Sequence, residues 1–236
     1  MEVVLFGDSL TVGRIGIAYR RYLPFTTVAR GIEGDTWIGV ASRAKRYLDV
    51  KERPEGTVLV IQGGANDLLL TSRPQGKRLI NHNTPPYSDD AEFASIFSEM
   101  LFSIEQEHPS ISLIVCSLPI IGEDLNSLLN ERRRQRNATL KALVAHSAHT
   151  LWCDIATPLE TIVRDLQSQK SNDIYFIEDI KNFASDAAYI GDNEVKAAEI
   201  SSKRNLVVTI DGIHLNATGA QAIAEALSEV VSDKLS

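Results

Sequence analysis

Apolar residues occur along this chain in two kinds of pattern. Some form short continuous runs rich in β-branched residues, which are typical of strands buried on both faces of a sheet. Others recur about every three or four residues, which is typical of amphipathic helices. The continuous runs lie at 3–6, 25–29, 57–61, 111–118 and 151–155, and the helical patterns between them lie at 15–21, 38–48, 89–108 and 125–149. This alternation predicts βαβ units with right-handed crossovers.

Strands that alternate with helices, with no hairpin signal between them, predict an α/β fold. We expect a three-layer α/β/α sandwich, flavodoxin-like, with a five-stranded parallel sheet of order 2-1-3-4-5. The chain has 236 residues, of which 44% are hydrophobic, and is therefore long enough for one well-buried core. We predict a single domain over 1–236, with a helical insertion at about 157–205 that covers the edge where the strands end.

The charge and hydropathy of the chain argue against some classes of partner. The net charge of −7 disfavours nucleic acid or an anionic membrane surface as the main partner. No apolar run is long enough to span a membrane, and the first run starts at Val3, which leaves no room for a signal peptide if Met1 is the first residue. We therefore expect a cytoplasmic protein without an integral membrane segment. The oligomeric state is not indicated.

The first strand ends in a sequence suited to ligand binding or catalysis. Gly7, Asp8 and Ser9 follow the apolar run, and short polar residues at such a turn often cap a helix. Open α/β sheets bind ligands in the crevice beyond the carboxyl ends of their strands. Ser9 therefore has three interpretations: a helix cap, part of a cradle for a phosphate, or a nucleophile. On this stretch alone we rank them in that order.

Two further strand ends carry glycine followed by polar residues. Gly31 and Gly34 follow the second strand, where glycine lets the backbone come close to a ligand. Asn66 follows a glycine pair after the third strand, and its amide either belongs to the turn or points at the crevice beside Ser9. A polar segment at 71–88 without periodicity predicts a long loop.

A histidine near the end of the chain has a carboxylate within reach. Asp211 precedes His214 by three residues, and both lie just ahead of the last helical pattern. A single turn closes that separation, so the carboxylate can hold one imidazole nitrogen and leave the other free. A histidine oriented toward a serine in this way is the general-base arrangement of acyl transfer.

The other histidines and the cysteines predict no metal or cofactor site. The histidines show no pairing at the spacing of metal ligands. Cys116 and Cys153 lie in separate strand-like runs, which predicts buried free thiols. We expect neither a metal nor a cofactor.

Two sequence signals bear on the helices. Asp89, Thr157 and Thr218 each precede a Glu or Gln by three residues, which is the pattern of a capping box. The basic run at 132–136 predicts a solvated helix face in this acidic protein, with a partner contact as the alternative.

Four short motifs, in this order, resemble the SGNH hydrolases, also called the GDSL esterase/lipase family. They are Gly7-Asp8-Ser9-Leu10, Gly34-Asp35-Thr36, Gly64-Ala65-Asn66-Asp67 and Asp211-Gly212-Ile213-His214. Each motif is weak alone, but three of them each follow a predicted strand. Together they reverse the ranking for Ser9. The resemblance covers about 1–156 and 206–236 and leaves out 157–205.

The resemblance implies a serine ester hydrolase that works through an acyl-enzyme intermediate. It implies that Ser9 attacks the ester carbonyl, that His214 accepts the serine proton and that Asp211 holds the imidazole. The implied oxyanion hole consists of the backbone N–H groups of Ser9 and Gly34 and the side-chain amide of Asn66, all uncharged donors. The implied partner is a small-molecule ester, with no cofactor.

Several alternatives stay open. Short acyl esters, lysophospholipids, thioesters and acetylated sugars all fit the implied chemistry. A flavodoxin-like module that binds a phosphate or a flavin would not need the downstream Asp211 and His214, and a non-catalytic relative would only bind acyl or sugar ligands. Asp8, Asp35 and Asp67 are expected to brace their loops.

The segment at 157–205 lies outside the resemblance and is expected to cap the active site. Its apolar stripe either packs on the body of the domain or lines an acyl pocket. From 173 to 199 there are seven acidic residues against two lysines, a local charge of −5 that disfavours anionic substrates. We therefore expect this segment to select substrates. The stripe consists of Phe176, Ile180, Phe183 and Ala187.

Overall fold

The computed structural model describes residues 2–50, 53–72, 87, 89–167, 175–176 and 181–235. Its centre is a five-stranded sheet in which all neighbouring strands are parallel and the order is β2-β1-β3-β4-β5. The strands are β1 (Val3–Gly7), β2 (Thr27–Gly31), β3 (Val58–Ile61), β4 (Ser112–Cys116) and β5 (Thr150–Cys153). The predicted fold class and strand order are confirmed.

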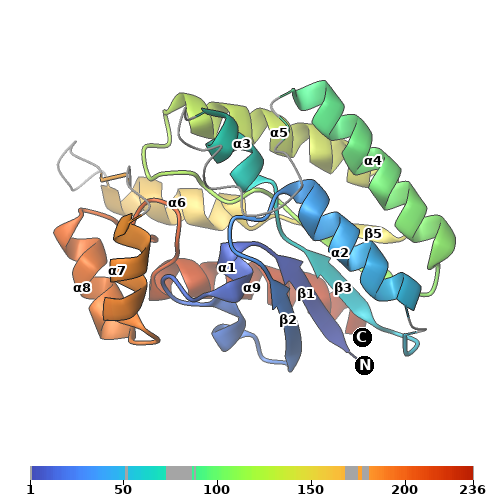
Figure 1. The fold of residues 1–236 in the computed structure, drawn as a ribbon, viewed down its shortest axis with the longest axis horizontal. Coiled ribbons are helices and arrows are strands. Elements are labelled where there is room, and N and C mark those ends of the chain that lie inside the picture. Colours follow the sequence, from blue (N-terminus) through green and yellow to red (C-terminus); the bar gives the residue numbers. More distant parts are fainter. Residues whose placement is uncertain are drawn as a thin grey trace.

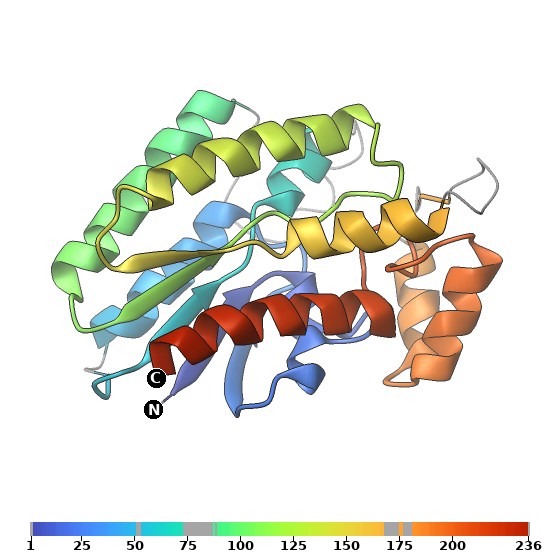
Figure 2. The same ribbon diagram turned by 180° about the vertical axis from the view of Figure 1, so that it is seen from behind.

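Helices cover both faces of the sheet (Figure 1). Those on one face are α2 (Trp37–Val50), α3 (Ala65–Ser72), α4 (Asp90–Glu107) and α5 (Leu128–Val144), and those on the other are α6 (Ala156–Gln167) and α9 (Ala217–Leu235). Figure 2 shows the second face, with α6 and α9 in front of the strands. The remaining helices are α1 (Ser9–Val12), the 3₁₀ helix η1 (Tyr19–Tyr22), α7 (Lys181–Ile190) and α8 (Glu194–Lys203).

The central strands are apolar on both faces because each face meets a separate helical layer. In β1, Val3 and Leu5 pack with the core that includes α6 and α9, whereas Val4 and Phe6 pack with the core that includes α2 and α4. All five residues of β1 are buried. This explains why its sequence shows no polar alternation.

The edge strand β2 differs from the buried strand that was predicted. It begins at Thr27 rather than at residue 25, and its middle residues are exposed. Because only β1 lies beside it, β2 borders solvent, and Val28 is among the exposed large apolar residues of the structure. A run with β-branched residues therefore identified a strand here without identifying its burial.

The predicted helix at 15–21 is mostly absent, since the described backbone there forms only the 3₁₀ helix η1. The predicted helix at 125–149 is shorter at both ends, because α5 is bounded by the cap of Ser127 and by Ala145. Most of the loop predicted at 71–88 lies outside the described residues.

Two of the three predicted helix caps are replaced by a neighbouring residue. Asp89 caps α4 as expected and accepts from the backbone N–H groups of Ala91 and Glu92. At the start of α6 the acceptor is Asp154, which also binds the hydroxyl of Thr157. At the start of α9 it is Asn216, which accepts from the N–H of Gly219. In both cases an Asx side chain precedes the predicted threonine, and a helix needs only one such acceptor.

The basic run on α5 is only partly the solvated face that its composition predicted, since Arg134 is exposed but two other arginines of the run are buried. Arg133 and Arg136 are 1% and 2% exposed. Arg133 pairs with Glu160 of α6, and Arg136 pairs with Asp90 of α4. These two arginines therefore tie α5 to α4 of its own layer and to α6 of the layer on the other face, because a buried charge requires a partner.

The segment predicted as an insertion divides into two parts. α6 belongs to the same helical layer as α9, since Leu159 and Val163 of α6 are buried in the core that also contains residues of α9. α7 and α8 instead form a pair at one end of the molecule, on the left of Figure 1. None of the described helices combines the length and the apolar character needed to cross a lipid bilayer.

We predict that Arg133→Ala lowers the free energy of unfolding by about 3–5 kcal/mol, because Glu160 loses its buried partner. Arg164 faces the same carboxylate from an exposed position, and its side chain is 66% exposed. Arg164→Ala is therefore the matched control and should cost less than about 1 kcal/mol. Urea unfolding of both variants measures the difference, and equal effects would contradict the buried pairing.

Candidate active site

Ser9 lies where β1 gives way to α1, because Asp8 and Gly13 bound a helix of one turn. The carboxylate of Asp8 accepts from the N–H of Leu10 at 3.0 Å, and its carbonyl accepts from the N–H of Val12 at 3.1 Å. Gly13 ends the helix in the left-handed conformation. This short turn holds Ser9 at the carboxyl end of β1, an inner strand of the sheet, where it is 9% exposed.

His214 lies in a loop that one carboxylate organises. Oδ1 of Asp211 accepts from the N–H groups of Ile213 and His214 at 2.8 and 2.7 Å. Oδ2 of Asp211 lies 2.7 Å from Nδ1 of His214. Asp211 thus closes the turn and orients the ring together, as the three-residue spacing predicted. With Nδ1 protonated and donating to Asp211, Nε2 is unprotonated and can accept.

The free nitrogen of His214 meets Ser9. Its Nε2 lies 3.1 Å from Oγ of Ser9, although the two residues are 205 positions apart in the chain. The ring of Phe183, on α7, contacts the imidazole edge-on with 5.0 Å between ring centroids. The structure therefore brings together the predicted Ser9, His214 and Asp211 in a continuous row of hydrogen bonds.

The charges around His214 favour its protonated form. Burial alone lowers the pKa of His214, but the charge and hydrogen bond of Asp211 outweigh burial, and Asp8 and Glu33 add to them, so the net pKa is raised. Burial likewise raises the pKa of Asp211, but His214 and two backbone N–H groups outweigh it, so the net pKa is lowered. An imidazolium formed at this position is therefore stabilised by the carboxylate beside it.

Asn66 connects the two loops that carry Ser9 and Gly34. Its Nδ2 donates to the carbonyl of Asp35 at 2.9 Å and lies 3.5 Å from Oδ2 of Asp8. Gly34 has a φ of +70°, a conformation that side-chain-bearing residues rarely adopt. The three predicted oxyanion donors thus come from neighbouring loops at the ends of β1, β2 and β3.

The aspartates of these motifs hold backbone and cations, as was expected. Asp35 accepts from Arg43 at 2.6 Å, and Asp67 accepts from the N–H groups of Trp37 and Tyr87 at 2.8 and 3.0 Å. Burial raises the pKa of Asp67 to about 6 against the effect of these N–H groups. Burial raises the pKa of Asp8 to about 6 as well, despite its bonds to Leu10 and Gln62.

A buried polar network beneath Ser9 was not predicted. Gln62 lies 3.4 Å from Asp8 through its Nε2 and accepts from Thr11 at 3.2 Å. The hydroxyl of Thr11 also lies 2.9 Å from that of Tyr19. The available signal was a glutamine directly after a buried strand, since an amide in that position needs polar partners. The network supports Asp8 and so the turn that carries Ser9.

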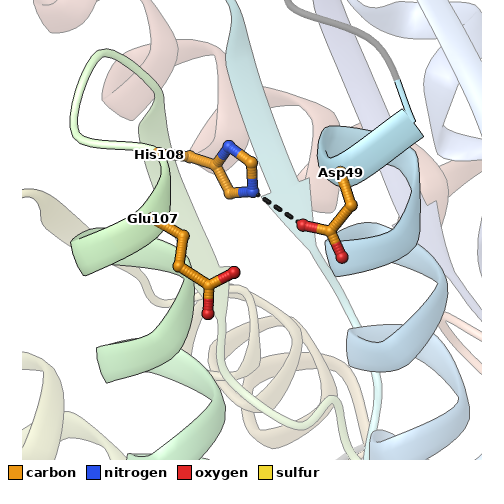
Figure 3. A group of neighbouring side chains, drawn as sticks. All are labelled: Asp49, Glu107 and His108. Atoms are coloured by element: carbon orange, nitrogen blue, oxygen red, sulfur yellow. Dashed lines mark hydrogen bonds and ion pairs between the residues drawn. The ribbon is translucent and has the colours of Figure 1, made fainter.

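Among the described residues, one group has the spacing to hold a metal ion: Asp49, Glu107 and His108, at the ends of α2 and α4 (Figure 3). His108 Nε2 lies 2.9 Å from Asp49. The ammonium of Lys45 also lies 2.6 Å from Glu107 and 3.2 Å from Asp49. A protein cation therefore already faces both carboxylates. These residues lie at the amino edge of the sheet, away from Ser9.

The protein is an α/β/α sandwich, and Ser9, His214 and Asp211 lie in a row at the carboxyl edge of its sheet. The profile of the GDSL-like lipase/acylhydrolase family matches residues 5–222. Since this is most of the chain, the protein belongs to that family, and its enzyme class is carboxylic ester hydrolase. None of the curated proteins matches the chain at a significant level.

Solved structures with the same fold match almost the whole chain. The acetyl xylan esterase AlAXEase is 19% identical, with a TM-score of 0.60, over 98% of this chain and 100% of that one. A G-D-S-L family protein from Veillonella parvula is 18% identical, with a TM-score of 0.59 and 98% of each chain covered. The acetylxylan esterase Axe2 from Geobacillus stearothermophilus is 13% identical, with a TM-score of 0.58, over 98% and 93%. At these identities the likeness shows the fold.

We predict that the imidazole of His214 titrates above its ordinary pKa near 6.5, and that Asp211→Asn lowers this pKa because the raising charge is removed. Nitrogen NMR of the histidine rings against pH measures both, with the His214 signals assigned by their loss in His214→Asn. An unchanged His214 pKa in Asp211→Asn would contradict the prediction.

Proposed function

We propose that the enzyme cleaves carboxylic esters through an acyl-enzyme intermediate, with Ser9 as nucleophile, His214 as general base and Asp211 as the group that orients the imidazole. The observation that carries this proposal is the row of contacts from Asp211 through His214 to Ser9, at 2.7 and 3.1 Å. Distances of this size permit direct proton transfer between the serine oxygen and the ring. If Ser9 were only a helix cap, its hydroxyl would not need a histidine beside it.

Each step follows from these contacts. Oγ of Ser9 bonds to the ester carbonyl carbon as its proton passes to Nε2 of His214. The resulting tetrahedral intermediate then expels the alcohol, which takes that proton from His214. Water next loses a proton to His214 and attacks the acyl-enzyme, and the carboxylic acid leaves as Ser9 regains the proton. Because the base must be neutral at the start, hydrolysis requires a pH above the raised pKa of His214.

The proposed oxyanion donors are the N–H groups of Ser9 and Gly34 and the amide of Asn66. The short bond from Asn66 to the carbonyl of Asp35 fixes the plane of the amide, while its 3.5 Å contact with Asp8 is long for a hydrogen bond. A developing oxyanion would therefore displace a weak contact and keep the strong one. Donors held in place before the reaction stabilise such a charge most effectively.

The relatives of known activity support both the chemistry and a first choice of substrate. Two further matching structures, each with a TM-score of 0.59, are catalytic mutants of Axe2. In one of them an aspartate is replaced by alanine, and in the other a histidine three positions after that aspartate is replaced by alanine. Asp211 and His214 have the same spacing. AlAXEase and Axe2 are acetylxylan esterases, so acetylated saccharides and short acyl esters come first in a substrate panel.

We predict that Ser9→Ala abolishes ester hydrolysis and leaves the fold intact, because the nearly buried turn loses only one hydroxyl. Initial rates on p-nitrophenyl acetate and on acetylated xylo-oligosaccharides measure the loss. A fluorophosphonate probe should label the wild-type protein and not the variant. The melting temperature serves as the control for folding. Hydrolysis near the wild-type rate in Ser9→Ala would exclude the proposed nucleophile.

We predict that Asn66→Ala lowers kcat by about 10²–10³-fold with little change in KM, because an oxyanion donor acts mainly in the transition state. Asn137 provides a matched control, since its amide also donates to a backbone carbonyl, that of Leu118, at 2.9 Å. Asn137→Ala should lower stability without this loss of kcat. If Asn66→Ala changed KM alone, Asn66 would bind substrate rather than the oxyanion.

We propose further that α7 and α8 form the cap of a single hydrolase domain and that Phe183 limits the acyl chain. Support comes from the edge-on contact of Phe183 with His214, which brings α7 next to the reacting groups. Arg204 holds the pair to the domain, since it binds Asp186 of α7 at 2.6 Å and the carbonyl of Ile210 at 2.8 Å. Ile180, of the predicted stripe, lies outside the described residues.

Three acidic residues of this cap have partners within the protein. Asp186 pairs with Arg204, and Glu199 pairs with Lys203 at 2.6 Å. Glu194 accepts from Tyr22 at 2.7 Å and also faces Arg21. Charges that are paired within the protein repel an approaching anion less than free ones do. Selection by shape at Phe183 therefore has better support than selection by charge.

We predict that Phe183→Ala raises the ratio of kcat/KM for p-nitrophenyl octanoate to that for the acetate by about threefold or more, because removal of the ring leaves space beside His214. The control is Tyr189→Ala, on the same helix, whose ring is 43% exposed and whose hydroxyl binds Glu199. That variant should keep the wild-type ratio. A wild-type ratio in Phe183→Ala as well would assign the ring a packing role only.

A further inference from the structure

A buried carboxylate outside the proposed machinery holds the segment that leads into the Asp211 loop. Glu123 lies in the loop between β4 and α5 and is 0% exposed. Its Oε1 accepts from the N–H groups of Val208 and Thr209 at 2.9 and 2.8 Å and from the hydroxyl of Thr209 at 2.7 Å. Its Oε2 accepts from the N–H of Val207 at 2.7 Å. One side chain thus receives four hydrogen bonds from three consecutive residues.

The hydroxyl of Thr209 extends this contact into the loop itself. Because its proton is donated to Glu123, its oxygen presents a lone pair to the N–H of Gly212, at 3.1 Å. The carbonyl of the same glycine accepts from the N–H of Gly122, at 2.6 Å. Gly212 lies between Asp211 and His214 in the sequence. Both polar groups of this residue are therefore tied, directly or through Thr209, to the loop that carries Glu123.

The chemistry of the segment explains why a carboxylate is suited to this position. Residues 206–210 form no strand. Within the described part of the chain, their β-type pairing is limited to a single isolated bridge between Thr209 and Leu215. Their buried N–H groups still require acceptors. An ionised carboxylate offers two oxygens with about four lone-pair directions and no donor. It can therefore satisfy converging N–H groups that a neighbouring strand would otherwise bind.

We propose that Glu123 is a positioning residue for catalysis, which fixes the Asp211–His214 loop so that Nε2 of His214 stays within hydrogen-bond reach of Ser9. This rests on the proposed function, in which His214 is the base. Glu123 and Val207 are 84 positions apart, so the contact joins two segments that no local turn would hold together. A displacement of about 1 Å between reacting groups can cost about 10²-fold in rate. That is the scale on which loss of this contact should act.

The dependence of kcat on pH distinguishes a positioning role of Glu123 from a role in stability alone. The charged groups that face His214 are Asp211 on its own loop, Asp8 beside Ser9 and Glu33 after β2, and all three raise its pKa against the effect of burial. If the loop relaxes, Asp211 moves relative to the ring and its contribution weakens. The pKa of His214 then falls, so the acidic limb of the kcat profile moves to lower pH.

Three variants and one control test the proposal. Glu123→Gln keeps the size of the side chain but turns an NH₂ group toward N–H donors. Thr209→Val removes only the hydroxyl between Glu123 and Gly212, and Thr209→Ser restores it. The control is Asp154→Asn, because Asp154 is also a carboxylate that accepts from two backbone N–H groups, at 3.1 Å each, but at the start of α6.

Each protein is assayed for kcat, KM and melting temperature against pH, with histidine NMR titration in parallel. We expect Glu123→Gln to lower kcat by about 10- to 100-fold, with KM within about twofold, and to lower the pKa of His214. Thr209→Val should act in the same direction and Thr209→Ser should recover most of the loss. Asp154→Asn should lower the melting temperature while kcat and the His214 pKa stay at their wild-type values.

The proposal is overturned if Glu123→Gln and Asp154→Asn both lower the melting temperature and neither changes kcat or the His214 pKa. Failure of the proposed function is a different result, namely hydrolysis that persists in Ser9→Ala. In that case the NMR titration still decides, since it follows the ring without requiring turnover. If Glu123→Gln does not fold, the comparison of Thr209→Val with Thr209→Ser decides in the same way.

Discussion

The hydrogen bond between Ser9 and His214 is the contact on which the architecture of the site depends. It joins residues 205 positions apart, and it forms because the first strand lies inside the sheet and the last helix packs on one of its faces. The strand order provides both conditions. With β1 between β2 and β3, three strand ends deliver Ser9, Gly34 and Asn66 to one edge, and α9 begins just after the loop that carries His214.

Buried polar side chains, rather than additional secondary structure, hold the loops of this edge. Asp8 caps the turn with Ser9, Asp67 receives backbone N–H groups from two other segments, and Asp35 binds Arg43. Burial of a carboxylate is unfavourable unless hydrogen bonds compensate. Each of these residues therefore favours the one loop conformation that supplies those hydrogen bonds. Asp8 and Asp67, whose pKa is raised to about 6, show how incomplete this compensation is.

The sequence predicted those features that local patterns encode. Continuous apolar runs identified the strands, and the motifs around Ser9 and His214 identified the groups that the fold brings together. Features that depend on distant partners were not predictable. Arg133 was expected to be solvated because Glu160 lies on another helix, and Glu123 gave no sequence signal because its donors are more than 80 positions away. Likewise, an apolar stripe gave no indication that Phe183 in particular would contact His214.

The two halves of the site are held by different kinds of contact. Ser9 depends on a helix cap within its own turn and on the network of Gln62, which directly follows the central strand β3. His214 depends on Asp211 within its loop, but that loop depends on a segment without a strand neighbour. Segments with few regular backbone partners open at lower free energy than the core. A buried acceptor such as Glu123 therefore raises the cost of opening where a lost contact would separate the proposed base from the proposed nucleophile.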